Sequence, residues 1–191
     1  MTKKTKIEKT RLLVDDFFKL EEAYVAFEKK DGEMSKTVRR LDLKRDDAVC
    51  ALIVNQHKGT VVLVRQFRYA ALSRGQAWPL ELVAGLIDDG EPAEDAIRRE
   101  ILEEAGYKVG PLQRLFTFYP SPGITSERGI LFYGETDGAE PVEAGGGLAE
   151  ENEDIEIVEL PFAEAFAMVE SGEIYDGKTL IGLLWLKNKL A

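Results

Sequence analysis

The chain has 191 residues, of which 45% are hydrophobic, and its 25 Lys and Arg against 35 Asp and Glu give a net charge of −10. This composition predicts one main folded domain with a sizeable core and a small additional unit. The negative charge argues against general binding to nucleic acid or anionic membrane, which depends on Lys and Arg. No apolar run approaches the roughly 20 residues that cross a bilayer. A single cysteine cannot form an internal disulfide, and no signal peptide is evident, so we expect a cytoplasmic protein.

Residues 1–45 predict a small antiparallel β annex. They are mixed and polar, and Asp31-Gly32 stands between alternating segments, which is a strong hairpin signal. From residue 48 the pattern changes to an apolar run over 48–54, a polar turn over 55–59 and a second apolar run over 61–64. Two buried strands around a turn are therefore expected. We place the main domain at residues 46–191.

A helix is predicted over residues 91–105. Pro92 stands near the start, where a helix tolerates proline, and Gly106 marks the end. An apolar stripe at helical spacing supports it: Ala93, Ile97, Ile101 and Ala105. Strands are predicted over 115–119, 129–134 and 155–160, and helices over 162–170 and 178–189. This order of elements indicates an α/β protein with a mixed sheet packed between helices.

Three carboxylates share one face of the helix predicted over 91–105. At about 100° per residue, Glu100, Glu103 and Glu104 fall within one arc of about 100°. A solvated acidic face is one interpretation. However, like charges four residues apart cost about 0.2–0.5 kcal/mol per pair, and no Lys or Arg lies within that arc. A hard divalent cation such as Mg²⁺ would relieve this repulsion and would suit a site that processes phosphates.

The residues around this helix resemble the Nudix box, G-x5-E-x7-R-E-U-x-E-E-x-G-U, where U is a bulky apolar residue. Every fixed position before the last is matched: Gly85, Glu91, Arg99, Glu100, Ile101, Glu103, Glu104 and Gly106. Tyr107 departs from the usual aliphatic residue, which we expect to affect packing alone. The resemblance implies a Nudix α/β/α sandwich with a mixed sheet. It also implies a hydrolase that uses Mg²⁺ or Mn²⁺ to cleave a nucleoside diphosphate linked to another group.

Segments beyond the box are similar to two groups within this family. Residues 66–68, 80–85, 121–128 and 147–155 resemble the ADP-ribose pyrophosphatase branch, and Pro122 takes the place of a proline typical of that branch. Residues 145–147, 172–174 and 176–179 resemble GDP-mannose pyrophosphatases. We therefore expect hydrolysis of a nucleoside diphosphate sugar. ADP-ribose, giving AMP and ribose 5-phosphate, is favoured, and GDP-mannose, giving GMP and mannose 1-phosphate, is the alternative.

The resemblance also implies roles for individual residues. Metal ligands would be the carboxylates of Glu100, Glu103, Glu104 and Glu153 and the backbone carbonyl of Ala84. Glu151, on a late loop, would be the base that activates water, and Glu103 and Glu104 would complete the catalytic set. By composition alone, the acidic stretch 150–156 would be a solvated loop. Glu91 and Arg99 would form a structural ion pair. The other structural residues of the box would be its glycines, Gly85 and Gly106.

Further residues would contact the substrate. Arg68 resembles the family's substrate arginine, although a structural arginine is an equal alternative. Glu81 and Ser121 are additional candidates, with polar roles at the edge of the core as an equal alternative. In dimers of this branch an annex arginine reaches the substrate of the neighbouring subunit, and either Arg39 or Arg40 matches it. The resemblance thus implies a homodimer with exchanged annexes.

Other classes of function stay open at this point. Some Nudix domains are ligand-binding regulators without catalysis, although a pure sensor needs no cluster such as Glu100, Glu103 and Glu104. An acidic protein-interaction module is supported by net charge alone, and a nucleoside triphosphatase is compatible with the box. His57 is the single histidine and falls in a predicted turn, which argues against a Ser-His-Asp device.

Overall fold

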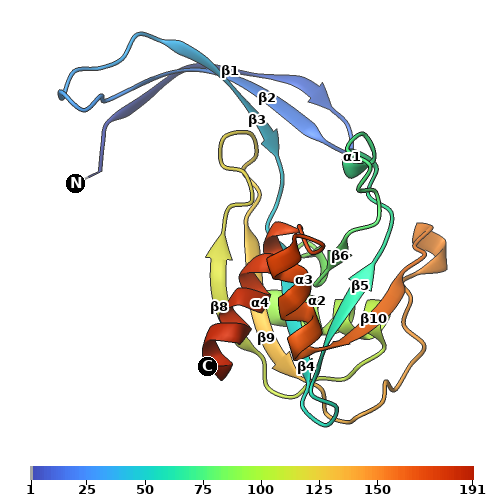
Figure 1. Cartoon of the computed structure of the whole chain (residues 1–191). Coiled ribbons are helices and arrows are strands. Elements are labelled where there is room, and N and C mark those ends of the chain that lie inside the picture. The colour runs from blue at the N-terminus through green and yellow to red at the C-terminus, as the bar shows by residue number, and fades with distance from the viewer. Residues whose placement is uncertain (1) are drawn as a thin grey trace. The chain divides into compact units, whose positions relative to one another are not determined.

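The computed structural model describes residues 2–191, apart from the side chain of Glu151 (Figure 1). The chain divides into two compact units. The first unit contains the residues up to Asp46 together with Tyr119–Arg128, and the second unit contains Asp47–Phe118 and Gly129–Ala191. The sequence did not indicate that residues 119–128 belong with the N-terminal part.

The first unit is a three-stranded antiparallel sheet in the order β1-β2-β3, built from β1 (Thr5–Asp15), β2 (Lys19–Phe27) and β3 (Val38–Lys44). The predicted turn at Asp31-Gly32 joins β2 to β3, and Gly32 has a φ of 85° there. The N–H of Leu43 donates to the carbonyl of Ile124 over 2.8 Å. This hydrogen bond helps to attach the segment Tyr119–Arg128 to β3.

The second unit contains a mixed sheet in the order β10-β5-β4-β9-β8. Strands β4 (Ala48–Asn55) and β9 (Gly129–Glu135) are parallel, while β5 (Thr60–Arg65), β8 (Gln113–Phe118) and β10 (Glu156–Pro161) are antiparallel to their neighbours. Two short strands, β6 (Leu80–Glu81) and β7 (Val83–Leu86), pair with β5 and β4. The mixed sheet confirms the sequence prediction.

Helices cover both faces of this sheet. Alternate residues of β4 show the reason, because Val49, Ala51 and Ile53 pack toward α2 (Ala93–Ala105). The intervening residues Cys50 and Leu52 pack toward α3 (Phe162–Ser171) and α4 (Gly177–Leu190), which lie over the other face (Figure 1). A strand buried on both faces needs a continuous apolar run, as seen over 48–54. The second unit is therefore the predicted α/β/α sandwich.

The remaining helices are short, namely α1 (Tyr69–Leu72) and the 3₁₀ turn η1 (Ala149–Glu151). None of the helices that the structure describes is long and apolar enough to cross a membrane. Helix α2 begins two residues later than predicted, because Pro92 has an extended ψ of 138° and precedes the first turn. It ends as predicted at Gly106, whose φ of 72° gives a left-handed cap.

Candidate active site

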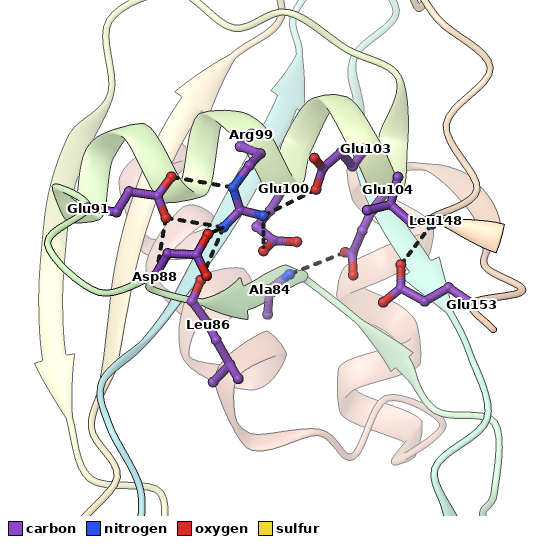
Figure 2. A network of polar contacts seen from close by, with 10 residues as sticks. All are labelled: Ala84, Leu86, Asp88, Glu91, Arg99, Glu100, Glu103, Glu104, Leu148 and Glu153. Carbon is purple, nitrogen blue, oxygen red and sulfur yellow. Dashed lines mark hydrogen bonds and ion pairs between the residues drawn. The ribbon is translucent and has the colours of Figure 1, made fainter. Parts of the chain in front are cut away.

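Glu100 and Glu104 of α2 point toward the strand that carries Ala84, and Glu103 lies beside them on the same helix (Figure 2). Glu104 is 2% exposed and accepts a hydrogen bond from the backbone N–H of Ala84 over 3.3 Å. The close approach of helix and strand depends on Gly85, because a Cβ at that position would lie 2.0 Å from the carboxyl carbon of Glu100. The glycine that opens the box therefore makes room for a carboxylate of the helix.

Burial and like charge both act on this cluster. Burial raises the pKa of Glu104 to about 8, with further contributions from the negative charges of Glu100 and Glu153. The N–H of Ala84 and the positive charge of Arg68 oppose this shift in the pKa. Burial also raises the pKa of Glu100. Each of these carboxylates is thus destabilised in its charged form.

Arg99 relieves part of the repulsion although it lies outside the acidic arc, so the expectation that only a bound cation would relieve it was wrong. Its Nη1 donates to Oε1 of Glu100 over 2.8 Å and to Oε2 of Glu103 over 3.2 Å (Figure 2). Its Nε and Nη2 bind the two carboxylate oxygens of Glu91 over 3.3 and 3.2 Å, and Nη2 also donates to the carbonyl of Leu86. A long side chain beside the arc can reach laterally across it, which an angular count of positions ignores.

The loop after β9 is attached to the C-terminal end of α2 through its glycines. The N–H of Gly146 donates to the carbonyl of Glu104 over 2.9 Å, and the N–H of Gly147 donates to that of Glu103 over 3.0 Å. These carbonyls have no partner within the helix and need one elsewhere. Gly145 has a φ of 63°, and a Cβ there would lie 2.9 Å from the carbonyl oxygen of Glu104. The glycine run therefore allows backbone to pack directly on backbone.

This loop carries two of the predicted functional residues. Glu153 accepts a hydrogen bond from the N–H of Leu148 over 3.0 Å, and its charge contributes to the raised pKa of Glu104. The side chain of Glu151, the predicted base, lies outside the described part of the structure. Its backbone belongs to η1 on the same loop.

The carboxylates fit a hard divalent cation by their chemistry. No group of three or more Asp, Glu, His or Cys among the described side chains is placed to hold a metal ion. The carboxylates are instead held by Arg99 and by the N–H groups of Ala84 and Leu148. Anionic oxygens are the ligands that Mg²⁺ prefers, and a buried carboxylate such as Glu104, which has no ion-pair partner among the described side chains, would gain from a cation.

A second charged cluster surrounds Glu81, which is 5% exposed. Arg68 donates to Oε2 of Glu81 through Nε over 2.9 Å and lies 2.7 Å from the same oxygen through Nη2. On the other side, Nζ of Lys178 donates to Oε1 over 3.0 Å. The structure thus brings together Arg68 and Glu81, which were both predicted to contact the substrate. It adds Lys178, which lies in the segment 176–179 that resembles GDP-mannose pyrophosphatases but was not predicted as a site residue.

Three other predicted substrate residues lie in the first unit. Arg39 binds the buried carboxylate of Glu22 through Nε. Arg40 donates to the carbonyl of Arg39 over 2.9 Å and is exposed. Ser121 is exposed, and its carbonyl accepts hydrogen bonds from two N–H groups of its own turn. Among the described residues, Arg39 thus forms an ion pair, whereas the side chain of Arg40 binds a backbone carbonyl.

Tyr107, the departure from the box pattern, has a polar role as well as a packing role. Tyr107 is 4% exposed, and its hydroxyl lies 3.4 Å from both the carbonyl of Ala139 and Oε2 of Glu159, either of which can accept its single proton. An aliphatic residue could fill the space but could not make these contacts.

We predict that Tyr107→Phe lowers the free energy of unfolding by about 0.5–1 kcal/mol, because the one long hydrogen bond that the hydroxyl can donate is lost while the ring is kept. Urea unfolding followed by tryptophan fluorescence measures this change. Turnover should equal that of the parent enzyme, since the hydroxyl contacts no residue of the acidic cluster in the described structure. A large loss of turnover would contradict the structural role.

The α/β/α sandwich and the box residues on and around α2 are the fold and the sequence motif of the Nudix hydrolases. The chain belongs to the Nudix family, since the family model described as "NUDIX domain" matches residues 44–179. The chain is 40% identical over 189 residues to GDP-mannose pyrophosphatases of Escherichia coli O1:K1 and of Shigella dysenteriae serotype 1, covering 98% of this chain and 97% of those relatives. A crystal structure of an ADP compounds hydrolase matches with a TM-score of 0.74 and 20% identity, covering 98% of this chain and 94% of that one. That likeness supports the fold.

Proposed function

We propose that this Nudix hydrolase cleaves the diphosphate of nucleoside diphosphate sugars with the help of Mg²⁺ or Mn²⁺. The observation that carries the proposal is the carboxylate cluster of α2, in which buried Glu104 lies beside Glu100 and the loop carboxylate of Glu153. A non-catalytic regulator or an interaction module would have no use for this unfavourable accumulation of charge. The cluster therefore favours catalysis over the two other classes.

Two sugar nucleotides are candidates for the substrate. GDP-mannose is supported by the 40% identity to GDP-mannose pyrophosphatases over nearly the full length of both chains. ADP-ribose, which the sequence segments favoured, is supported by the loop residues 125–128 and 148–155 that resemble that branch. We place GDP-mannose first because its support extends along 98% of the chain.

In the proposed reaction, Glu100, Glu103, Glu104, Glu153 and the carbonyl of Ala84 would hold the divalent cation. When bound, the cation would act as a Lewis acid and neutralise charge on the phosphate oxygens. Glu151 would accept a proton from the attacking water, whose oxygen forms a bond to one phosphorus atom. The bond from that phosphorus to the bridging oxygen breaks, which gives a nucleoside monophosphate and a sugar phosphate. Arg68 would bind phosphate oxygens through its guanidinium.

The test is ³¹P NMR of GDP-mannose and ADP-ribose incubated in parallel with the enzyme, with Mg²⁺ and again with a chelator. Conversion of GDP-mannose to GMP and mannose 1-phosphate that stops with chelator is the expected result. Faster conversion of ADP-ribose would reverse the order of the two substrates. Binding of either compound without any turnover would refute catalysis and support a ligand-binding regulator.

We also propose that the chain forms a homodimer through its first unit. The supporting observation is β1, an exposed edge strand with several exposed apolar side chains: Ile7, Leu12, Leu13 and Val14. Such an edge is a template for pairing with another chain. In this arrangement Arg40 would contribute to the substrate site of the partner subunit.

We predict that the parent enzyme is a dimer by light scattering and that Leu12→Asp together with Val14→Asp gives a monomer with greatly reduced activity. A mixture of two inactive variants, Arg40→Ala and Glu104→Gln, tests the exchange directly. Random reassembly would restore about a quarter of the parent activity, because a heterodimer has one intact composite site. A monomeric parent enzyme, or a mixture that stays inactive, would contradict the exchanged dimer.

A further inference from the structure

A buried carboxylate joins two cations from distant parts of the chain. Glu81 lies on β6, whereas Arg68 follows β5 and Lys178 lies in the first turn of α4. Each carboxylate oxygen of Glu81 serves one cation, Oε2 for Arg68 and Oε1 for Lys178. Burying charge is unfavourable unless it is paired with good geometry. In this protein the buried charge of Glu81 is paired with two cations, Arg68 and Lys178.

The carboxylate has a rigid support. Glu81 pairs with Val64 in the sheet, and the next residue, Leu82, donates its N–H to the hydroxyl of Thr179 over 2.9 Å. The N–H of Thr179 in turn donates to Asp176, the cap of α4, over 3.0 Å. The strand that holds Glu81 and the helix that carries Lys178 are therefore fixed to one another by short polar contacts.

The cations keep donors available for a further ligand. Arg68 contacts Glu81 only along its Nε and Nη2 edge, so the end of the guanidinium formed by Nη1 and the second N–H of Nη2 is unused by the described residues. Lys178 contacts Glu81 and Asp176, at 3.0 and 3.2 Å, which leaves one of its N–H groups. A guanidinium end of this kind can bind a phosphate through two parallel hydrogen bonds.

The pair also borders the acidic cluster. Ala84, whose N–H binds Glu104, follows Glu81 by three positions along the strand segment β6–β7. Arg68 acts electrostatically on Glu104. A diphosphate that binds a cation at the acidic cluster would therefore lie near Arg68.

We propose that Glu81 is a positioning residue, which does not touch the substrate but fixes Arg68 and Lys178 as a pair of donors for the anionic oxygens of the diphosphate. This inference rests on the proposed function and deepens it. It replaces the expectation that Glu81 contacts the substrate directly, because both of its oxygens are occupied by cations. The contrary role would be that of a competitor, a carboxylate that neutralises the cations and weakens the binding of phosphate.

The two roles predict opposite effects of substitution. Glu81→Asp keeps the charge but shortens the side chain by one methylene, so that one carboxylate cannot reach both cations. Glu81→Gln keeps the shape but presents an amide NH₂ to one of the cations. If Glu81 positions the pair, both variants bind a diphosphate more weakly. If Glu81 competes with phosphate, Glu81→Gln binds the diphosphate more tightly.

The experiment measures binding of methylenediphosphonate, a diphosphate that resists hydrolysis, to the full-length protein by calorimetry in the presence of Mg²⁺. We expect both variants to bind at least tenfold more weakly than the parent. Glu159→Gln is the matched control, since Glu159 also binds a lysine, Lys58, and an uncharged partner, Asn55, but lies outside the proposed site. The control should lose stability and keep the affinity of the parent.

Steady-state kinetics with the sugar nucleotide separates positioning from general damage. We expect KM to rise at least tenfold in both variants, while kcat falls by a smaller factor. A double-mutant cycle tests whether Glu81 acts through Arg68. If it does, Glu81→Asp should change KM less in the Arg68→Ala variant than in the parent. Thermal melts of each variant test whether it is folded. If Glu81→Gln does not fold, Glu81→Asp alone decides the outcome, because it keeps the buried charges balanced.

Unchanged affinity of Glu81→Asp, tighter binding by Glu81→Gln, or a parent that does not bind the diphosphonate would each overturn the positioning role. A parent that binds the diphosphonate but turns over no sugar nucleotide would refute the proposed function instead. In that case the comparison of affinities between parent and variants still decides the role of Glu81.

Discussion

Glu104→Gln is expected to abolish Mg²⁺-dependent turnover while leaving the fold intact. The variant keeps an oxygen that can accept the N–H of Ala84, but it loses the anionic oxygens at the centre of the acidic cluster. A bound cation contributes several kcal/mol to stabilising phosphate charge, and each 1.4 kcal/mol is about tenfold in rate. We therefore expect kcat to fall by a factor of about 10³ or more, measured by ³¹P NMR or by release of the monophosphate.

The same substitution should stabilise the metal-free protein. Because burial raises the pKa of Glu104 to about 8, the folded state binds its proton more tightly than the unfolded state, where the pKa is about 4.5. Ionisation of Glu104 therefore lowers the free energy of unfolding as the pH rises between these two values. The glutamine does not ionise. In chelator, the advantage of the variant should grow with pH by up to about 1.4 kcal/mol per unit across this range.

Glu94→Gln provides the control on the same helix, since Glu94 is exposed and pairs with Arg98 over 2.9 Å at the surface. This variant should keep full turnover and a pH dependence of stability equal to that of the parent. Denaturant unfolding at pH 5.5 and pH 8 in chelator measures all three proteins. Near-normal turnover of Glu104→Gln, or equal stability of parent and variant at pH 8, would refute the assignment of Glu104 as a buried metal ligand.

Gly145→Ala is expected to give the second large effect, by detaching the loop that carries Glu151 and Glu153 from α2. A methyl group would lie 2.9 Å from the carbonyl oxygen of Glu104 and 2.8 Å from a methyl carbon of Ile157. The left-handed φ of 63° adds about 1–2 kcal/mol for a residue with a Cβ. We expect unfolding free energy to fall by more than about 2 kcal/mol and kcat to fall at least tenfold.

The matched control is Gly172→Ala at the end of α3. Gly172 has a φ of 80°, so it carries a similar conformational penalty, but a Cβ there would meet no atom within 4 Å. We expect a stability loss of about 1–2 kcal/mol without any change in kcat. If both alanine variants lose activity to the same extent, the loop anchor is not responsible. Hydrogen exchange at residues 146–155 would report the detachment of the loop directly.

Much of the second unit could be predicted from sequence because its signals are local. The apolar run over 48–54 became β4, the periodic segment ending at Gly106 became α2, and both C-terminal helices lie within one or two residues of their predicted positions. The short elements α1, β6 and β7 were not predicted, since four residues or fewer carry no measurable periodicity. The hairpin between β1 and β2 was also missed, because its turn at residues 16–18 has no Asn-Gly or Asp-Gly signal.

The sequence by itself determined the family and the acidic face of α2, because the spacing of residues along one helix depends only on helical geometry. Tertiary structure alone decided which charges meet across the chain. Arg99 reaches Glu100 and Glu103, and Lys178 reaches Glu81 from 97 positions away. It also decided the backbone contact between the glycine run and α2. Such contacts follow from how the layers pack and how far long side chains reach, which no local pattern of residues encodes.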